Sequence, residues 1–169
     1  MLEKHIKVGA PSFLPYERFS GMGNGALVEC EGTTKAFAFG SFKFLPFLPN
    51  AIHTVAAAGV DVISAPFSGC LMAAYTDESG RRMVCHISTG GEFGDCKAAW
   101  NDMKGRFTNV VEFRPSDLCG DTKFETCYGL ITQESGCYAV LVQAQNATLP
   151  SNSGGVYKTD AKFVKLAKA

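Results

Sequence analysis

A cluster of turn-forming residues between two strand-like segments constrains the fold of this chain more than any other feature. The cluster is Asp77-Glu78-Ser79-Gly80; residues 71–75 before it are apolar, and residues 81–87 after it have the composition of a strand. Two such segments joined by a short polar loop predict an antiparallel β-hairpin.

The register of this hairpin would bring a thiol close to an imidazole. If Thr76 pairs with Gly80 around a three-residue loop, Cys70 lies directly opposite His86. Directly opposed residues of an antiparallel pair point to the same face, with Cβ atoms about 4.5–5.5 Å apart. A slip of one residue, or a bulge, would separate the two side chains. The predicted Cys70–His86 pair therefore depends on this register.

Length and composition predict a single globular domain over residues 1–169. Hydrophobic residues make up 46% of the sequence and charged residues 19%, which argues against a disordered chain. The 16 basic and 16 acidic residues give a formal net charge of zero, so no basic surplus indicates binding to nucleic acid or to an anionic membrane. No apolar run reaches the roughly 18 residues of a membrane-spanning helix.

The pattern of seven cysteines argues against a disulfide framework and against a metal site. The count is odd, and residues 1–5 lack the apolar core of a signal peptide, so we expect synthesis in a cytosol and no disulfide framework. No two cysteines have Cys-x-x-Cys spacing and only three histidines are present, so no zinc is expected. Apart from Cys70, the cysteines are expected to be small buried apolar residues. They are Cys30, Cys85, Cys96, Cys119, Cys127 and Cys137.

The remaining patterns indicate many strands and two helices. Residues 1–24 are rich in proline and glycine and are expected to form an irregular N-terminal arm. Helices are expected at residues 50–58, with Asn50 as the N-cap, and at residues 92–104. Besides the central hairpin, strands are expected at residues 26–31, 34–39, 60–64, 107–113, 122–132 and 137–145. Residues 146–155 are expected to form a polar loop, and residues 156–166 an element of uncertain type.

Consecutive strands of this pattern are separated by short turns. The sequence therefore predicts an α+β fold with mostly antiparallel or mixed sheets, arranged as a sandwich-like core flanked by helices. Residues 41–49 are an exception, because two prolines argue against a central strand. Phe42, Phe44 and Phe47 in this segment either pack under a loop or line the mouth of a pocket, and packing is the more frequent outcome.

The residues around Cys70 have the types that thiol catalysis needs. A cysteine nucleophile reacts as a thiolate, and a neighbouring imidazole such as His86 can take its proton. Gly69 leaves room for a substrate carbonyl, and the backbone N–H of Cys70 can stabilise the oxyanion by about 3 kcal/mol. Ser64 is the expected partner of the second nitrogen of His86, with Asp95 and Asp102 as weaker alternatives.

A structural interpretation of the same residues stays open. Ser-Gly-Cys tripeptides occur by chance at strand starts, and a histidine on a strand is more often packed or exposed than catalytic. His53 is a competing partner for Cys70, although no spacing favours it. Cys85 precedes His86, so in a regular strand it faces the opposite side and belongs to the core.

Phe67-Ser68-Gly69-Cys70, an apolar strand, and then His86 with Thr89-Gly90 just beyond resemble the bacterial deamidase toxins that carry a Leu-Ser-Gly-Cys motif. These are the catalytic domain of cytotoxic necrotizing factor and the Burkholderia lethal factor. The resemblance implies two mixed β-sheets flanked by helices, and a Cys-His dyad that hydrolyses a glutamine side chain of a host protein. Ser64 stands where the lethal-factor branch has a threonine, six residues before the cysteine.

The match covers residues 64–90 and departs from the motif at three places. Phe67 replaces the motif leucine, Ser64 replaces the threonine, and two residues separate His86 from Thr89. The resemblance implies a host protein as substrate, either a GTPase or a translation factor. It also implies export from a bacterial cytosol, without a signal peptide, into the cytoplasm of the host cell.

The sequence thus predicts a monomeric cysteine-dependent protein glutamine deamidase without metal or organic cofactor. Cys70 is the predicted nucleophile, His86 the base and Ser64 its orienting partner. Ser68 and Gly69 are expected to form the oxyanion site, and Phe67 and Thr89 to contact the substrate. Two alternatives remain: a related acyltransferase (transglutaminase) or peptidase using the same thiol, and a non-enzymatic interaction module that binds through residues 42–47.

Overall fold

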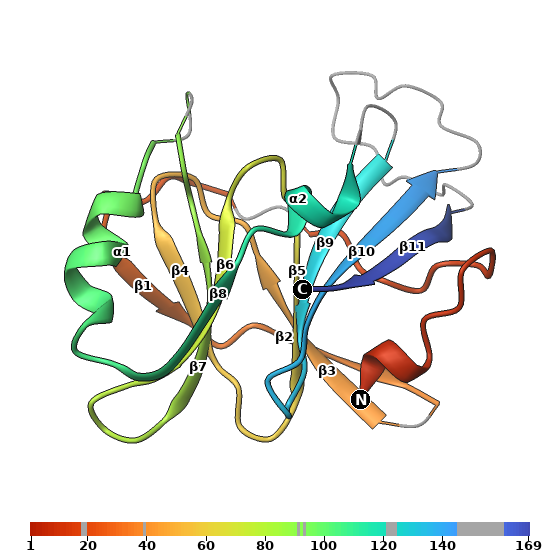
Figure 1. The fold of residues 1–169 in the computed structure, drawn as a ribbon, viewed down its shortest axis with the longest axis horizontal. Helices are drawn as coiled ribbons and strands as arrows, with labels where there is room; N and C mark the ends of the chain where they lie inside the picture. Colours follow the sequence, from red (N-terminus) through yellow and green to blue (C-terminus); the bar gives the residue numbers. More distant parts are fainter. Residues whose placement is uncertain (18–19, 39, 91, 93, 121–124, 145–160) are drawn as a thin grey trace.

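Two mixed β-sheets pack face to face in the computed structural model (Figure 1), which describes all residues except 18–19, 39, 91, 93, 121–124 and 145–160. The first sheet has five strands in the order β1 (Leu27–Cys30), β4 (Ile52–Ala56), β7 (Arg82–Ile87), β6 (Leu71–Thr76) and β8 (Thr108–Phe113). The second has six, in the order β11 (Ala161–Lys168), β10 (Cys137–Ala144), β9 (Glu125–Ile131), β5 (Asp61–Ala65), β3 (Gly40–Pro46) and β2 (Thr33–Phe37). The predicted α+β class with mixed sheets is confirmed.

Each sheet contains a parallel pair that local patterns did not predict. β1 runs parallel to β4, and β3 runs parallel to β5. β1 and β2 are consecutive in the chain but belong to different sheets, so the expectation that consecutive strands form hairpins is wrong there. The hairpins β6–β7 and β9–β10 are antiparallel, as expected.

Residues from both sheets form one core between them. Val55 and Val84 of the first sheet meet Val62 and Ile131 of the second, and all four are fully buried. Successive side chains along a strand point to opposite faces of the sheet, so the other residues of each strand face away from this core. The outer face of each sheet also carries large apolar side chains, and a separate segment of the chain packs on each of these faces.

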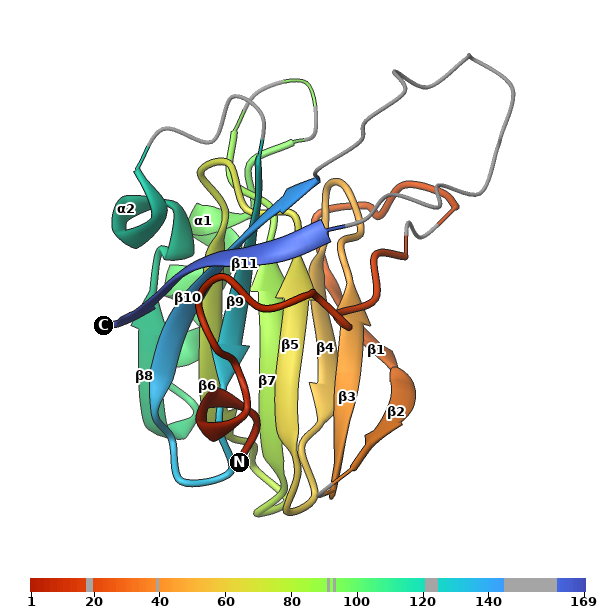
Figure 2. The same ribbon diagram turned by 90° about the vertical axis from the view of Figure 1, so that its right-hand side faces the viewer.

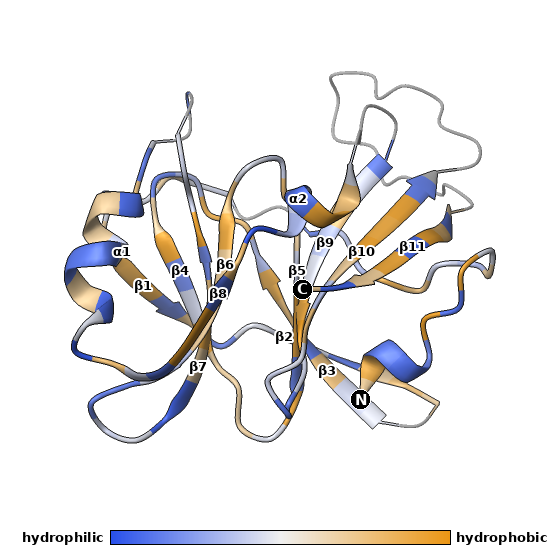
Figure 3. Cartoon of the chain, in the orientation of Figure 1, coloured by the Kyte–Doolittle hydropathy of each residue, from blue (hydrophilic) through white to orange (hydrophobic). Residues whose placement is uncertain are grey.

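Helix α1 (Lys97–Lys104) covers the outer face of the first sheet, where Trp100 is fully buried against Tyr75. The N-terminal segment covers the second sheet: it begins with the short 3-10 helix η1 (Leu2–Lys4) and crosses the strands in Figure 2. Leu2 and Ile6 are buried there against Phe163 of β11. Figure 3 shows hydrophobic residues along the strands and hydrophilic ones in the turn between β6 and β7.

Two expectations about individual elements are wrong. Residues 52–56 form β4 and not a helix, because His53 and Val55 are buried against the other sheet while Ile52 packs under α1. Residues 40–46 form β3 inside the second sheet, since Pro46 lies at the last position of the strand, where a missing N–H costs least. Phe42 and Phe44 are core residues, in agreement with the packing alternative.

The segment around α2 (Pro115–Cys119) was not predicted. A disulfide joins Cys119 at the end of this helix to Cys127 of β9, with the two Cα atoms 6.3 Å apart. This bond corrects the expectation that these two cysteines are free buried residues: α2 and β9 hold them, eight residues apart in the chain, within bonding range. Helix α1 is shorter than predicted, and the expected polar loop at 146–155 lies outside the described residues. No helix in the described part of the chain has the length and apolar character to cross a membrane.

Candidate functional site

The hairpin that carries the predicted pair is present, but its register differs from the prediction by two residues. His86 lies opposite Met72, and Leu71 lies opposite Ile87, so the next position along places Cys70 opposite Ser88. The prediction that Cys70 lies directly opposite His86 is therefore wrong. A shift of two residues keeps the face, and Cys70, which immediately precedes β6, packs against the core between the two sheets, on the side that His86 faces.

The turn explains this shift. Asp77 and Arg81 form the closing pair, with the Asp77 N–H donating to the Arg81 carbonyl at 2.9 Å. The Asp77 carboxylate also accepts bonds from the N–H groups of Ser79 and Arg81. Gly80 has a φ of +81°, a left-handed conformation that suits the last position of a three-residue hairpin loop. The loop is thus three residues long, as predicted, but begins one residue later.

A hydrogen-bond chain between the two sheets fixes the tautomer of His86. The Ser64 hydroxyl lies 2.5 Å from the carbonyl oxygen of Leu45 and 2.7 Å from His86 Nδ1. Because the carbonyl can only accept, the serine hydroxyl donates to it and must accept from His86. His86 Nδ1 therefore carries the proton, and Nε2 has the lone pair. Nε2 is buried and has no hydrogen-bond partner among the described residues.

Aromatic rings hold the His86 imidazole in place. Phe67 stacks on it with ring centroids 4.0 Å apart and planes 8° from parallel, and Phe47 lies at 4.9 Å. Gly129 of β9 makes room for this stack: a Cβ atom there would lie 2.9 Å from the Phe67 ring and 2.5 Å from the sulfur of Met72. Phe67 and Gly129 thus position the imidazole without touching solvent.

A second buried histidine lies beside the first. His53 of β4 is directly opposite His86 of β7, and both are fully buried on the inner face. His53 Nδ1 donates to the carbonyl oxygen of Pro46 at 2.7 Å, since a carbonyl can only accept. Burial, with the neighbouring His53, lowers the pKa of His86 to about 3, and burial also lowers the pKa of His53. Both imidazoles are therefore neutral at physiological pH.

Cys70 is half-buried immediately before β6 and is a free thiol. Burial raises its pKa; hydrogen bonds to the backbone and side chain of Thr89 and the positive charge of Arg114 lower it, but less. The thiol is therefore protonated at neutral pH. Within the described part of the chain, no hydrogen bond joins Cys70 Sγ to His86 Nε2. The ligand-free site holds a neutral thiol and a neutral imidazole, not an ion pair.

The other predicted site residues surround this arrangement. Ser68 is exposed, Gly69 is half-buried with a φ of +142°, and Thr89 donates to the Gly69 carbonyl at 2.8 Å. This bond ties the loop before Cys70 to the end of β7. Phe67 is only 1% exposed, so it packs on His86 and does not face a substrate as predicted. The expected contact of Ser64 with His86 is present, through the hydroxyl group.

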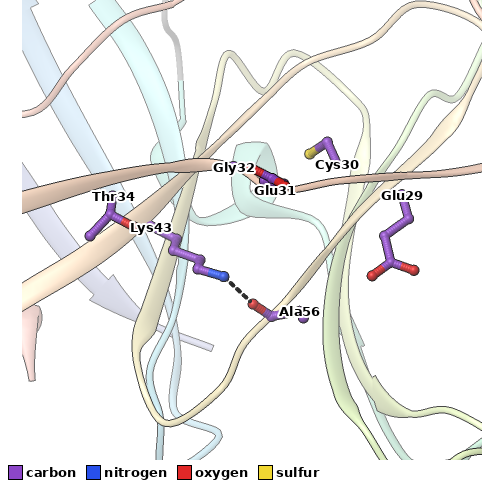
Figure 4. Close-up of a pocket in the computed structure, with 7 residues that line it drawn as sticks. All are labelled: Glu29, Cys30, Glu31, Gly32, Thr34, Lys43 and Ala56. Carbon is purple, nitrogen blue, oxygen red and sulfur yellow. Dashed lines mark hydrogen bonds between the residues drawn. The ribbon is translucent and has the colours of Figure 1, made fainter.

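A hollow lies elsewhere, beside the edge strands β1 and β2 (Figure 4). It has a volume of about 660 Å³ and is lined by Glu29, Cys30, Glu31 and Lys43 among others. Lys43 crosses it and donates to the carbonyl of Ala56 at 2.9 Å. None of the predicted site residues lines this hollow. Among the described residues, no group of three or more His, Cys, Asp or Glu side chains is placed to hold a metal ion.

Sequence reasoning named His53 only as a competing partner of Cys70 on an expected helix, and it missed Phe47, Gly129 and Arg114 as neighbours of the site. The β-branched residues beside His53 were a signal for a strand, which would have placed it next to His86. The other three reach the site through pairings between distant strands and left no local signal. Comparisons with protein-family models, with curated proteins and with solved structures gave no match.

Proposed function

We propose that the protein is a cysteine-dependent amidohydrolase that deamidates a glutamine side chain of another protein. The observation that supports this most is the hydrogen bond from His86 Nδ1 to Ser64, which leaves the Nε2 lone pair free on the sheet face that also carries Cys70. A fixed tautomer that leaves the Nε2 lone pair available is what a general base beside a nucleophile requires.

The reaction begins with a neutral pair. Cys70 Sγ attacks the amide carbon while its proton passes to His86 Nε2, so the thiolate forms only as the bond to carbon forms. The oxyanion accepts bonds from the Cys70 N–H and the Ser68 hydroxyl. His86 then protonates the leaving nitrogen, ammonia departs, and a thioester remains. Water attacks the thioester with His86 as base; the sulfur leaves with the proton, and glutamate is released.

Cys70 and His86 differ in their access to solvent, and this difference fits their proposed roles as nucleophile and base. Ser68 is exposed and Cys70 half-buried, so the substrate amide approaches from the loop before β6. His86 is fully buried behind this loop, where low dielectric strengthens its attraction to the developing thiolate. The absence of a Cys70–His86 hydrogen bond without substrate is compatible with this role, because catalytic bonds often tighten only in the complex.

By resemblance to the Leu-Ser-Gly-Cys toxins, the proposed substrate is a host GTPase or translation factor, reached after export from a bacterium. Conversion of a neutral amide into a carboxylate removes a donor and adds a charge, which is enough to disrupt a buried contact of such a target.

Intact-mass spectrometry of host proteins incubated with the protein tests this proposal. Wild type should add about one dalton to a target and release ammonia, whereas Cys70→Ser should do neither. Cys30→Ser is the matched control, because Cys30 is the other half-buried free thiol. Ser64→Ala should reduce kcat about tenfold or more while the protein stays folded.

The alternatives give different products. A primary amine added to the reaction would be incorporated into the target by a transglutaminase, with less ammonia released, and a peptidase would shorten the chain. A one-dalton gain that persists with Cys70→Ser would overturn Cys70 as the nucleophile. Full activity of Ser64→Ala would remove the orienting serine from the mechanism.

A further inference from the structure

Strand pairing brings a positive charge next to Cys70. Phe113, the last residue of β8, lies opposite Met72 of β6. Arg114 is the next residue of the chain and has an extended backbone, with φ −109° and ψ 104°. It therefore continues along β6 beside Leu71, one residue from Cys70. Its charge reaches the thiol, where it favours the anionic form.

The Arg114 side chain lacks the partners that other arginines of the protein have. Its Nε is buried without a hydrogen-bond partner, and nowhere in the described ranges does its guanidinium form an ion pair or hydrogen bond. By contrast, Arg81 pairs with Glu29 and Asp77, and Arg82 donates to the carbonyls of Thr132 and Gln133. A buried guanidinium nitrogen without an acceptor is unfavourable unless a ligand provides one.

We propose that Arg114 forms an anion-binding subsite beside Cys70 that takes a carboxylate carried by the substrate next to the reacting amide. The planar guanidinium presents paired donors that match the two oxygens of a carboxylate. This inference rests on the proposed function and adds a preference to it: a target glutamine with an acidic residue as neighbour. Arg114 then selects the substrate and places the amide over the thiol.

Alkylation of Cys70 by two probes of nearly the same shape tests the subsite without any substrate. Iodoacetate carries a carboxylate and iodoacetamide a neutral amide, so the ratio of their rates at Cys70 reports the local charge. The rates are measured by peptide mass mapping in wild type, Arg114→Gln and Arg114→Lys. Loss of the charge should lower the iodoacetate-to-iodoacetamide ratio at Cys70 about threefold or more, and Arg114→Lys should retain most of it.

Cys30 is the internal control, because it lies in the hollow away from Arg114 and its ratio should be the same in all three proteins. A ratio at Cys70 that is unchanged in Arg114→Gln would overturn the subsite. If Arg114→Gln does not fold, the salt dependence of the ratio is measured in the wild-type protein instead. About 1 M NaCl should lower the ratio at Cys70 relative to about 50 mM NaCl, and an unchanged ratio would overturn the proposal. Because alkylation needs no turnover, this result is independent of whether Cys70 deamidates a protein.

Discussion

Lys43 and Ser64 both reach across the space between the sheets, and they do so in opposite settings. Lys43 reaches from β3 to the carbonyl of Ala56 at the open edge of the sandwich, within a hollow of about 660 Å³. Ser64 reaches from β5 to His86 of β7 in the closed interior, where both residues are fully buried. The first contact is partly buried beside an open hollow, and the second is sealed by Phe67 and Phe47.

This difference shows that a hollow in the surface and the groups suited to catalysis lie in different parts of the protein. The open hollow has a lysine with a hydrogen-bond partner, and its Glu29 pairs with Arg81. The closed region has a lowered histidine pKa and a buried nitrogen lacking a partner in the described part of the chain. Perturbed and unpartnered groups are the stronger indicator of a site, so we place the proposed chemistry behind the loop before β6 and not in the open hollow.

The largest effect on the free energy of unfolding is expected from adding a side chain in the closed interior around His86. Gly129→Ala would place a Cβ atom within 3 Å of Met72, Pro115 and Phe67. The rigid rings of Pro115 and Phe67 would have to move, at a cost of about 3 kcal/mol in the free energy of unfolding. Guanidinium unfolding measures this. Gly105→Ala is the control, since nothing lies within 4 Å of its Cβ position, and it should change stability by less than about 1 kcal/mol. Equal effects would contradict the tight packing around His86.

Acid should weaken the closed region next. The pKa of His86 is about 3 in the folded protein and 6.5 in the unfolded chain, so only the unfolded state takes up the proton as the pH falls below 6.5. The free energy of unfolding therefore decreases by about 1.4 kcal/mol per pH unit from this group, or about 2 kcal/mol between pH 6.5 and pH 5. This contribution should be absent in His86→Gln. The same pH dependence in both proteins would show that His86 is not neutral and buried.

Removing the Ser64 or the Lys43 contact should have the smallest effects on stability, and the two losses should differ measurably. Ser64→Ala leaves His86 Nδ1 and the Leu45 carbonyl without a partner in a dry interior, and should lower the free energy of unfolding by about 1–2 kcal/mol. Lys43→Met leaves the Ala56 carbonyl accessible to water and should cost less than about 0.5 kcal/mol. Both are read from urea unfolding at neutral pH. A larger loss in Lys43→Met would reverse the comparison.

Local patterns predicted most strands but few of their partners. The turn at Asp77–Gly80 gave the β6–β7 hairpin, and residues 107–113 and 137–145 were placed within a few residues. The helix expected at 50–58 is a strand because burial on both faces outweighs a capping signal at Asn50. The parallel pairs β1–β4 and β3–β5 join segments separated by other elements, and no local periodicity records such partners.

The candidate site shows the same limits. Position in the chain suggested Ser64 as the partner of His86, and the hydroxyl makes this contact. The hairpin register was wrong by two residues because Gly80 occupies the left-handed position of the loop, a detail of turn geometry that decides which residues face each other. His53 and Arg114 come from other strands, so their closeness to His86 and Cys70 follows from sheet order alone.

The sequence by itself determined the hairpin, its polar turn and the face shared by Cys70 and His86, because side-chain alternation along a strand is a local property. Only the tertiary structure decided that His86 is dry and neutral, that Ser64 sets its tautomer, and that Arg114 approaches the thiol. These properties arise from the packing of two sheets, since burial and cross-sheet hydrogen bonds depend on residues far apart in the chain.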